Sequence, residues 1–138
     1  MHAVATAKGL QVIEANEKGI KHIQTHLNSK DIKCVAMVKA NIVLIGFFNS
    51  SDLTLYNLSN SCTLQNIPNP SKDKYVWRII PLKNYSFLIS DQKSVSIIDL
   101  STDQKPHTQV ISNIENPKKG IFARLEKNDK LTIFYNET

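Results

Sequence analysis

The stretch 39–45, KANIVLI, returns twice along the chain, as KNYSFLI at 83–89 and as KNDKLTI at 127–133. The leading lysine and the closing isoleucine both recur at a constant step of 44 residues. A period of roughly 20–50 residues is typical of proteins in which each repeat is one supersecondary unit. The chain is therefore expected to consist of tandem copies of one structural unit.

A second set of matching stretches lies downstream of the first. The stretch 53–58, LTLYNL, matches VSIIDL at 95–100 and, more weakly, LQVIEA at 10–15. Short runs rich in β-forming residues alternate with turn-forming clusters at a spacing of about ten residues, which indicates an all-β array. The pattern predicts strands at 3–7, 10–15, 20–25, 32–38, 42–48, 53–58, 62–67, 75–80, 86–90, 95–100, 108–112, 120–125 and 131–136. This spacing amounts to four strands per repeat.

The run 42–48, IVLIGFF, is apolar at both odd and even positions. Successive side chains of a strand point to opposite faces, so an apolar run of this kind predicts a strand that is buried on both faces. Four-stranded sheets that pack face to face would bury it in this way. A sheet with one solvated face would alternate apolar with polar residues.

On these stretches the chain resembles the WD-repeat family. VLIG at 43–46, followed by NSSD at 49–52 and by 53–58, looks like the second strand, turn and third strand of that family's repeat. FLISD at 87–91 followed by 95–100 repeats the pattern, with Ile98 and Asp99 where the Trp-Asp pair would fall. No Trp-Asp pair and no Gly-His pair is present, which leaves the subfamily unassigned. The resemblance implies a partial β-propeller of four-stranded antiparallel blades.

The same resemblance implies a non-catalytic scaffold for protein–protein interactions within a larger assembly. The expected units are a partial blade at 1–27, blades at 28–68 and 69–114, and a partial blade at 115–138. Propellers close with roughly four to eight blades, because closure removes exposed sheet edges. The remaining strands are expected from a longer gene product, from a second copy in a homodimer, or from a different protein that closes the edges.

A helix is the main alternative for one segment. Ile20, Ile23 and Leu27 keep an i, i+3, i+7 spacing over 19–28, which is compatible with one apolar helix face. A strand is favoured because the segment occupies the place of the fourth strand of a blade.

Composition predicts a soluble protein of the cytoplasm or nucleus. The 138 residues contain no apolar run approaching the ~20 residues that span a bilayer, and the beginning lacks the layout of a secretory signal. Cys34 and Cys62 are expected to be buried free thiols, which pack as small hydrophobes.

Lysine accounts for most of the net charge of +5. In the propeller interpretation, eight lysines in the connections gather on one face, and Arg78 is added as a residue that either pairs with a carboxylate or faces the central channel. The candidate partner-binding residues are Lys8, Lys30, Lys33, Lys72, Lys74, Lys93, Lys118, Lys119 and Arg78. Nearby acidic residues favour a merely solvated face. The alternative function is the binding of nucleic acid or of an acidic or phosphorylated peptide.

Motifs for catalysis or for cofactors are not found. His22 and His26 have the i, i+4 spacing of zinc ligands, but the glutamate of a metalloprotease motif is missing, so the spacing is interpreted as coincidental. The four glycines are isolated, which argues against a phosphate-binding loop. The sequence therefore predicts no catalytic residue, no metal and no cofactor.

Overall fold

A computed structural model of the chain describes residues 2–6, 9–27, 32–48, 50, 52–68, 78–90, 94–101, 107–113, 119–125, 127–128 and 130–136. For 94, 107–113, 119–125 and 131–136 it describes the backbone alone. Within these residues the chain contains strands and turns and no helix. The prediction of an all-β chain is confirmed.

The first seven strands form two antiparallel sheets. Sheet A contains β1 (His2–Thr6), β2 (Gly9–Asn16) and β3 (Gly19–His26), paired in chain order. Sheet B contains β4 (Ile32–Lys39), β5 (Ile42–Phe47), β6 (Leu53–Asn57) and β7 (Cys62–Ile67), again in chain order. Because β3 is a strand, the alternative of a helix over 19–28 is wrong.

The last six strands form two more antiparallel sheets. Sheet C contains β8 (Arg78–Pro81), β9 (Ser86–Ser90), β10 (Ser94–Asp99) and β11 (His107–Asn113). Sheet D contains β12 (Lys119–Leu125) and β13 (Leu131–Asn136). The thirteen strands of the described residues fall where the sequence pattern places them. The expected strand at 75–80 is described only from Arg78 onward.

The repeat is present in the pairing of the strands. The last isoleucine of each repeated stretch lies opposite a residue that recurs at the same step of 44 residues. These pairs are Val35 with Ile45, Ile79 with Ile89, and Ala123 with Ile133. Strand hairpins β4–β5, β8–β9 and β12–β13 are therefore equivalent units.

The turns repeat the same hydrogen bonds. The backbone N–H of Leu58 donates to the carbonyl oxygen of Asn41 at 2.7 Å. The backbone N–H of Leu100 donates to the carbonyl oxygen of Tyr85 at 3.0 Å. Both acceptors have the positive φ of a tight turn, at 63° and 58°. These bonds satisfy backbone groups outside the strand ladders, and in sheets B and C they tie the turn of the first hairpin to the end of the third strand.

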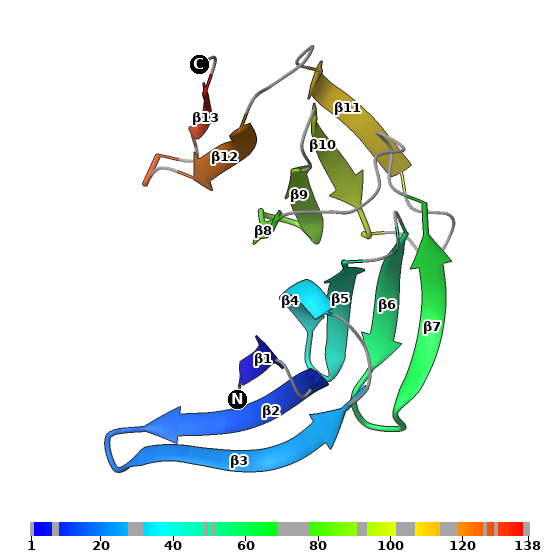
Figure 1. Cartoon of the computed structure of the whole chain (residues 1–138), viewed down its shortest axis with the longest axis vertical. Helices are drawn as coiled ribbons and strands as arrows, with labels where there is room; N and C mark the ends of the chain where they lie inside the picture. The colour runs from blue at the N-terminus through cyan, green and yellow to red at the C-terminus, as the bar shows by residue number, and fades with distance from the viewer. Residues whose placement is uncertain are drawn as a thin grey trace.

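The four sheets follow one another along an arc (Figure 1). Strands β1, β4, β8 and β12 lie toward the open centre of the arc, and β3, β7 and β11 lie along its outside. β1 contacts β4, β4 contacts β8, and β8 contacts β12, so the inner strands form a continuous row.

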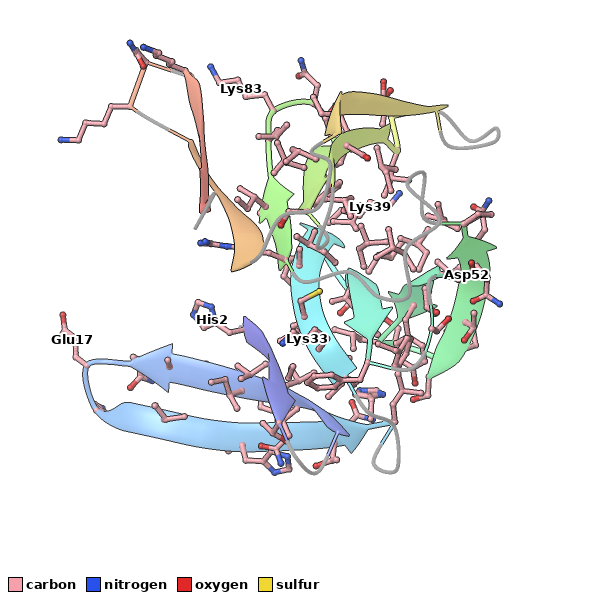
Figure 2. All side chains as sticks on the ribbon, turned by 45° about the horizontal axis from the view of Figure 1, so that its top comes forward. His2, Glu17, Lys33, Lys39, Asp52 and Lys83 are labelled. Carbon is pink, nitrogen blue, oxygen red and sulfur yellow. The ribbon has the colours of Figure 1, made fainter. Side chains whose placement is uncertain are left out.

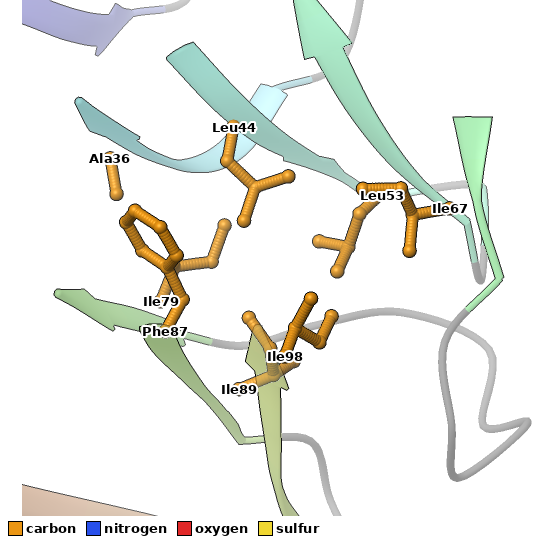
Figure 3. Packing of buried hydrophobic residues seen from close by; sticks show 8 residues of the cluster. All are labelled: Ala36, Leu44, Leu53, Ile67, Ile79, Phe87, Ile89 and Ile98. Atoms are coloured by element: carbon orange, nitrogen blue, oxygen red, sulfur yellow. The ribbon is translucent and has the colours of Figure 1, made fainter. Parts of the chain in front are cut away.

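Two apolar clusters fill the spaces between successive sheets. Leu44 lies in the cluster between sheets B and C, which Figure 3 shows together with Phe87 and Ile98. Val43 and Ile45 lie in the cluster between sheets A and B. All three β5 side chains are fully buried, and burying such a side chain contributes about 1.5–3 kcal/mol.

The prediction that both faces of the 42–48 run are buried is thus confirmed for β5. It is wrong for Phe48, which follows the strand and is 46% exposed.

Cys34 and Cys62 are thiols that are only half-buried, which corrects the expectation of buried thiols. Cys34 packs against the cluster between sheets B and C, and burial raises the pKa of its thiol to about 12. Cys62 lies at the start of an outer strand, where its thiol donates to the side-chain oxygen of Asn60.

Candidate interaction surface

The structure describes the side chains of two of the nine candidate partner-binding residues. Lys33 is half-buried in β4, and its Nζ lies 4.7 Å from the centroid of the Phe48 ring (Figure 2 labels Lys33). Arg78 is exposed at the start of β8, opposite Ser90. These two residues lie at the beginning of neighbouring inner strands. Lys33 is held by a cation–π contact within the chain.

The other seven candidates are not described as side chains. Lys119 is placed by its backbone at the start of β12. The rest lie outside the described residues, and they are Lys8, Lys30, Lys72, Lys74, Lys93 and Lys118. The lysine face therefore stays a prediction from the sequence.

The two histidines with zinc-like spacing have different surroundings. His26 ends β3 and is 4% exposed, and its Nδ1 lies 3.2 Å from the Tyr56 hydroxyl and 3.3 Å from the Ser61 hydroxyl. His22 is exposed and pairs with the hydroxyl of Thr25 at 2.9 Å. Among the described residues, no three His, Cys, Asp or Glu side chains gather into a group that could hold a metal ion.

His26 joins sheet A to sheet B through this polar contact. Burial lowers the pKa of His26, because the charged imidazolium loses its hydration between the sheets. Its Nε2 atom is buried and has no hydrogen-bond partner among the residues that the structure describes. The neutral ring is therefore the form that this contact accommodates.

One feature was not predicted from the sequence: the outer face of sheet A, which is the face directed away from sheet B. In sheets B and C, the face toward the preceding sheet buries an equivalent set of side chains. In sheet B these are Val43, Ile45, Tyr56 and Leu58, and in sheet C they are Phe87, Ile89, Ile98 and the half-buried Leu100. The strand pairings and the sequence match place His2, Val4, Ile13 and Ala15 at the same positions of sheet A.

No described part of the chain covers those positions in sheet A. Val4 is 38% exposed, Ile13 is half-buried, and His2 and Ala15 are exposed. On the adjoining β3, Ile20 is 75% and Ile23 is 48% exposed.

The hairpin of β2 and β3 extends away from the other sheets, with Glu17 at its tip (Figure 2). A sheet face with exposed apolar side chains beside a polar hairpin tip can bury area against a protein partner.

The signal for this surface was present in the repeat. Residues 10–15 match 53–58 and 95–100, so the equivalent positions could have been compared at once. In the sequence, Ile20 and Ile23 show only a spacing that is compatible with a helix. No local feature of a strand tells which of its sides remains uncovered.

No family model matches this chain, and no curated protein or solved structure matches it either. Within the described residues, no helix is long and apolar enough to span a membrane.

Proposed function

We propose that this chain is a non-catalytic scaffold for protein–protein interactions, and that it is part of a WD-repeat-like β-propeller within a larger intracellular assembly. In this proposal each of sheets A to D is a blade or part of one. The 44-residue step in the strand pairing and the burial of β5 on both faces support the propeller arrangement. Blades that repeat around an axis bury both of their faces in this way.

The observation that carries the proposal is the uncovered outer face of sheet A. The equivalent faces of sheets B and C are largely buried, whereas Val4 and Ile20, which lies opposite Ala15, are exposed. Exposed apolar side chains that are grouped on one sheet face mark interaction sites more often than side chains scattered singly. The apolar side chains of this face offer area to bury, which favours binding over catalysis.

The experiment compares two pairs of substitutions in the full chain. Ile20→Ser with Ile23→Ser changes the two exposed isoleucines of β3, of which Ile20 lies opposite Ala15 on the outer face of sheet A. The control pair, Leu64→Ser with Tyr85→Ser, changes two exposed side chains elsewhere, one on β7 and one in the turn before β9. A partner is identified by reciprocal purification and mass spectrometry, and its affinity for each purified variant is measured by calorimetry.

We expect the sheet A pair to weaken binding at least tenfold and the control pair to leave it unchanged. Equal affinities for the two folded variants would overturn the proposal that this face binds the partner.

A further inference from the structure

The junction between sheets A and B differs chemically from the junction between sheets B and C. The last residue of the outer strand is His26 in β3 and Ile67 in β7. These two positions are equivalent, because His26 lies opposite Leu10 as Ile67 lies opposite Leu53. A histidine therefore stands at the first junction where an isoleucine stands at the second.

The residue that meets this side chain on the next sheet differs in the same way. Tyr56 of β6 and Ile98 of β10 are equivalent, since their partners in the strand pairing are one repeat step apart. Ile67 and Ile98 both belong to the apolar cluster between sheets B and C. His26 and Tyr56 are in contact between sheets A and B. The first junction thus contains a group that titrates near neutral pH where the second has two isoleucines.

The surroundings of His26 suit a neutral ring and disfavour a charged one. Its Nδ1 lies 3.2 Å from the Tyr56 hydroxyl and 3.3 Å from the Ser61 hydroxyl. In the imidazolium form both ring nitrogens are donors, and Nε2 is buried with no acceptor among the described residues. Protonation of the closed junction would therefore bury a charged donor without a partner, which is costly.

The groups that face His26 from sheet B are uncharged. β6 presents the Tyr56 phenol and the β6–β7 turn presents the Ser61 hydroxyl, while the adjoining Cys62 thiol donates to a side-chain oxygen of its own turn. β5, β6 and β7 contain no charged residue. The charged residues of sheet B are on β4, at the opposite edge from β7, and they are Lys33 and Lys39.

Sheet A also places its other titratable groups away from His26. Leu10 lies opposite His26 on β2. The charged or titratable residues of the sheet A strands other than His26 lie nearer the tip of the β2–β3 hairpin, and they are His2, Glu14, Lys21 and His22. The connection that follows β3 contains Lys30 and Asp31, which lie outside the described residues. The test below therefore substitutes His26 itself.

We propose that the junction between sheets A and B is an acid-labile joint, which opens when His26 is protonated while the junction between sheets B and C stays closed. This device goes beyond the proposed scaffold function and does not depend on it. Opening would bring Leu10 and Val12 of sheet A, and Val43 and Ile45 of sheet B, into contact with water. The apolar surface that the chain offers would thus change with pH.

The direction and size of the effect follow from proton linkage. Burial lowers the pKa of His26 in the closed junction, and opening restores the ordinary pKa of 6.5. The closed form is therefore fully favoured above about pH 6.5 and loses stability as the pH falls from there. At pH 5 the ratio of open to closed molecules can rise by at most about thirtyfold.

The test compares the parent chain with a variant in which this junction takes the composition of the other one. The variant is His26→Ile with Tyr56→Ile. Hydrogen exchange is followed by mass spectrometry at pH 7.5 and pH 5, with correction for the intrinsic exchange rate. In the parent chain, acid should speed exchange of the β1–β3 amides at least about threefold more than that of the β9–β10 amides. In the variant this difference should disappear.

Two further variants make the result independent of how well isoleucine packs. His26→Gln keeps a polar side chain that cannot be protonated, and it should also remove the acid response. Ile67→His with Ile98→Tyr places the pair between sheets B and C, and it should extend the acid response to the β9–β10 amides. Circular dichroism at pH 7.5 confirms that each variant folds.

An acid response of equal size in sheets A and C of the parent chain would overturn the proposal, because the joint would then not open separately. Persistence of the response in folded His26→Gln would overturn it as well. Neither outcome bears on partner binding by the exposed side chains of sheet A at neutral pH, so the scaffold function is tested separately.

Discussion

The ring of His26, at the end of β3, lies edge-on to the ring of Tyr56 in β6, with centroids 5.6 Å apart and planes at 77°. The two residues belong to different sheets and are 30 positions apart in the chain. Their contact combines an aromatic pair with a hydrogen bond in the apolar layer between sheets A and B. Substitutions at this contact therefore report on whether sheets A and B stay packed together.

Removal of the Tyr56 hydroxyl should destabilise the fold slightly. Tyr56→Phe keeps the ring and loses the hydrogen bond to Nδ1 of His26. Because the Ser61 hydroxyl lies 3.3 Å from the same nitrogen, the expected loss is about 0.5–1 kcal/mol in the free energy of unfolding. Urea denaturation measures it. An unchanged midpoint would show that Ser61 replaces the tyrosine fully.

The stability of the chain should depend on the protonation of His26. Burial holds the pKa of His26 below 6.5 in the folded chain, so the unfolded chain binds more protons as the pH falls. The contribution is complete above about pH 6.5 and is lost as the pH falls from there toward the folded pKa. The parent chain should therefore lose more stability between pH 7.5 and pH 5 than His26→Gln, in urea titrations at each pH. Parallel pH curves would contradict this role of His26.

Two leucines in strands should respond very differently to truncation. Leu44 is fully buried between sheets B and C, and Leu64 is 46% exposed on β7. Leu44→Ala should reduce the free energy of unfolding by about 2–5 kcal/mol, because it leaves a cavity between the sheets. Leu64→Ala should change it by less than about 0.5 kcal/mol. Similar losses for the two variants would mean that sheets B and C do not pack in solution as described.

The alternative function, binding of nucleic acid or of an acidic peptide through the lysine face, can be tested by charge reversal. If an acidic peptide or a nucleic-acid backbone binds there, changing Lys72, Lys74, Lys118 and Lys119 to Glu should abolish binding, because charge reversal turns attraction into repulsion. Binding of generic RNA and DNA by the parent chain should also weaken steeply as salt rises. Gel-shift titrations at several salt concentrations measure both effects. Unaltered binding by the folded variant would remove this function.

The strands and their grouping were predictable because the signals are local. The step between Lys39, Lys83 and Lys127 is a property of the linear chain, and so is the run of apolar residues at both parities in 42–48. Side chains of a strand alternate between two faces, so such a run already requires cover on both sides. The prediction failed at Phe48, where the strand has ended and the alternation no longer applies.

The candidate site could not be predicted in the same way. Whether Ile20 and Ile23 are covered depends on which sheet lies against sheet A, and the strand pattern is compatible with either outcome. The histidine spacing also gave no hint of burial, because His26 meets Tyr56 only when β3 and β6 come together from distant parts of the chain.

The sequence by itself therefore determined the repeat, the strand positions and the need for face-to-face packing, since each follows from periodicity along the backbone. The tertiary structure alone decided which face of sheet A is exposed and which histidine is buried. These features depend on contacts between residues far apart in the chain, and such contacts form only when the sheets pack.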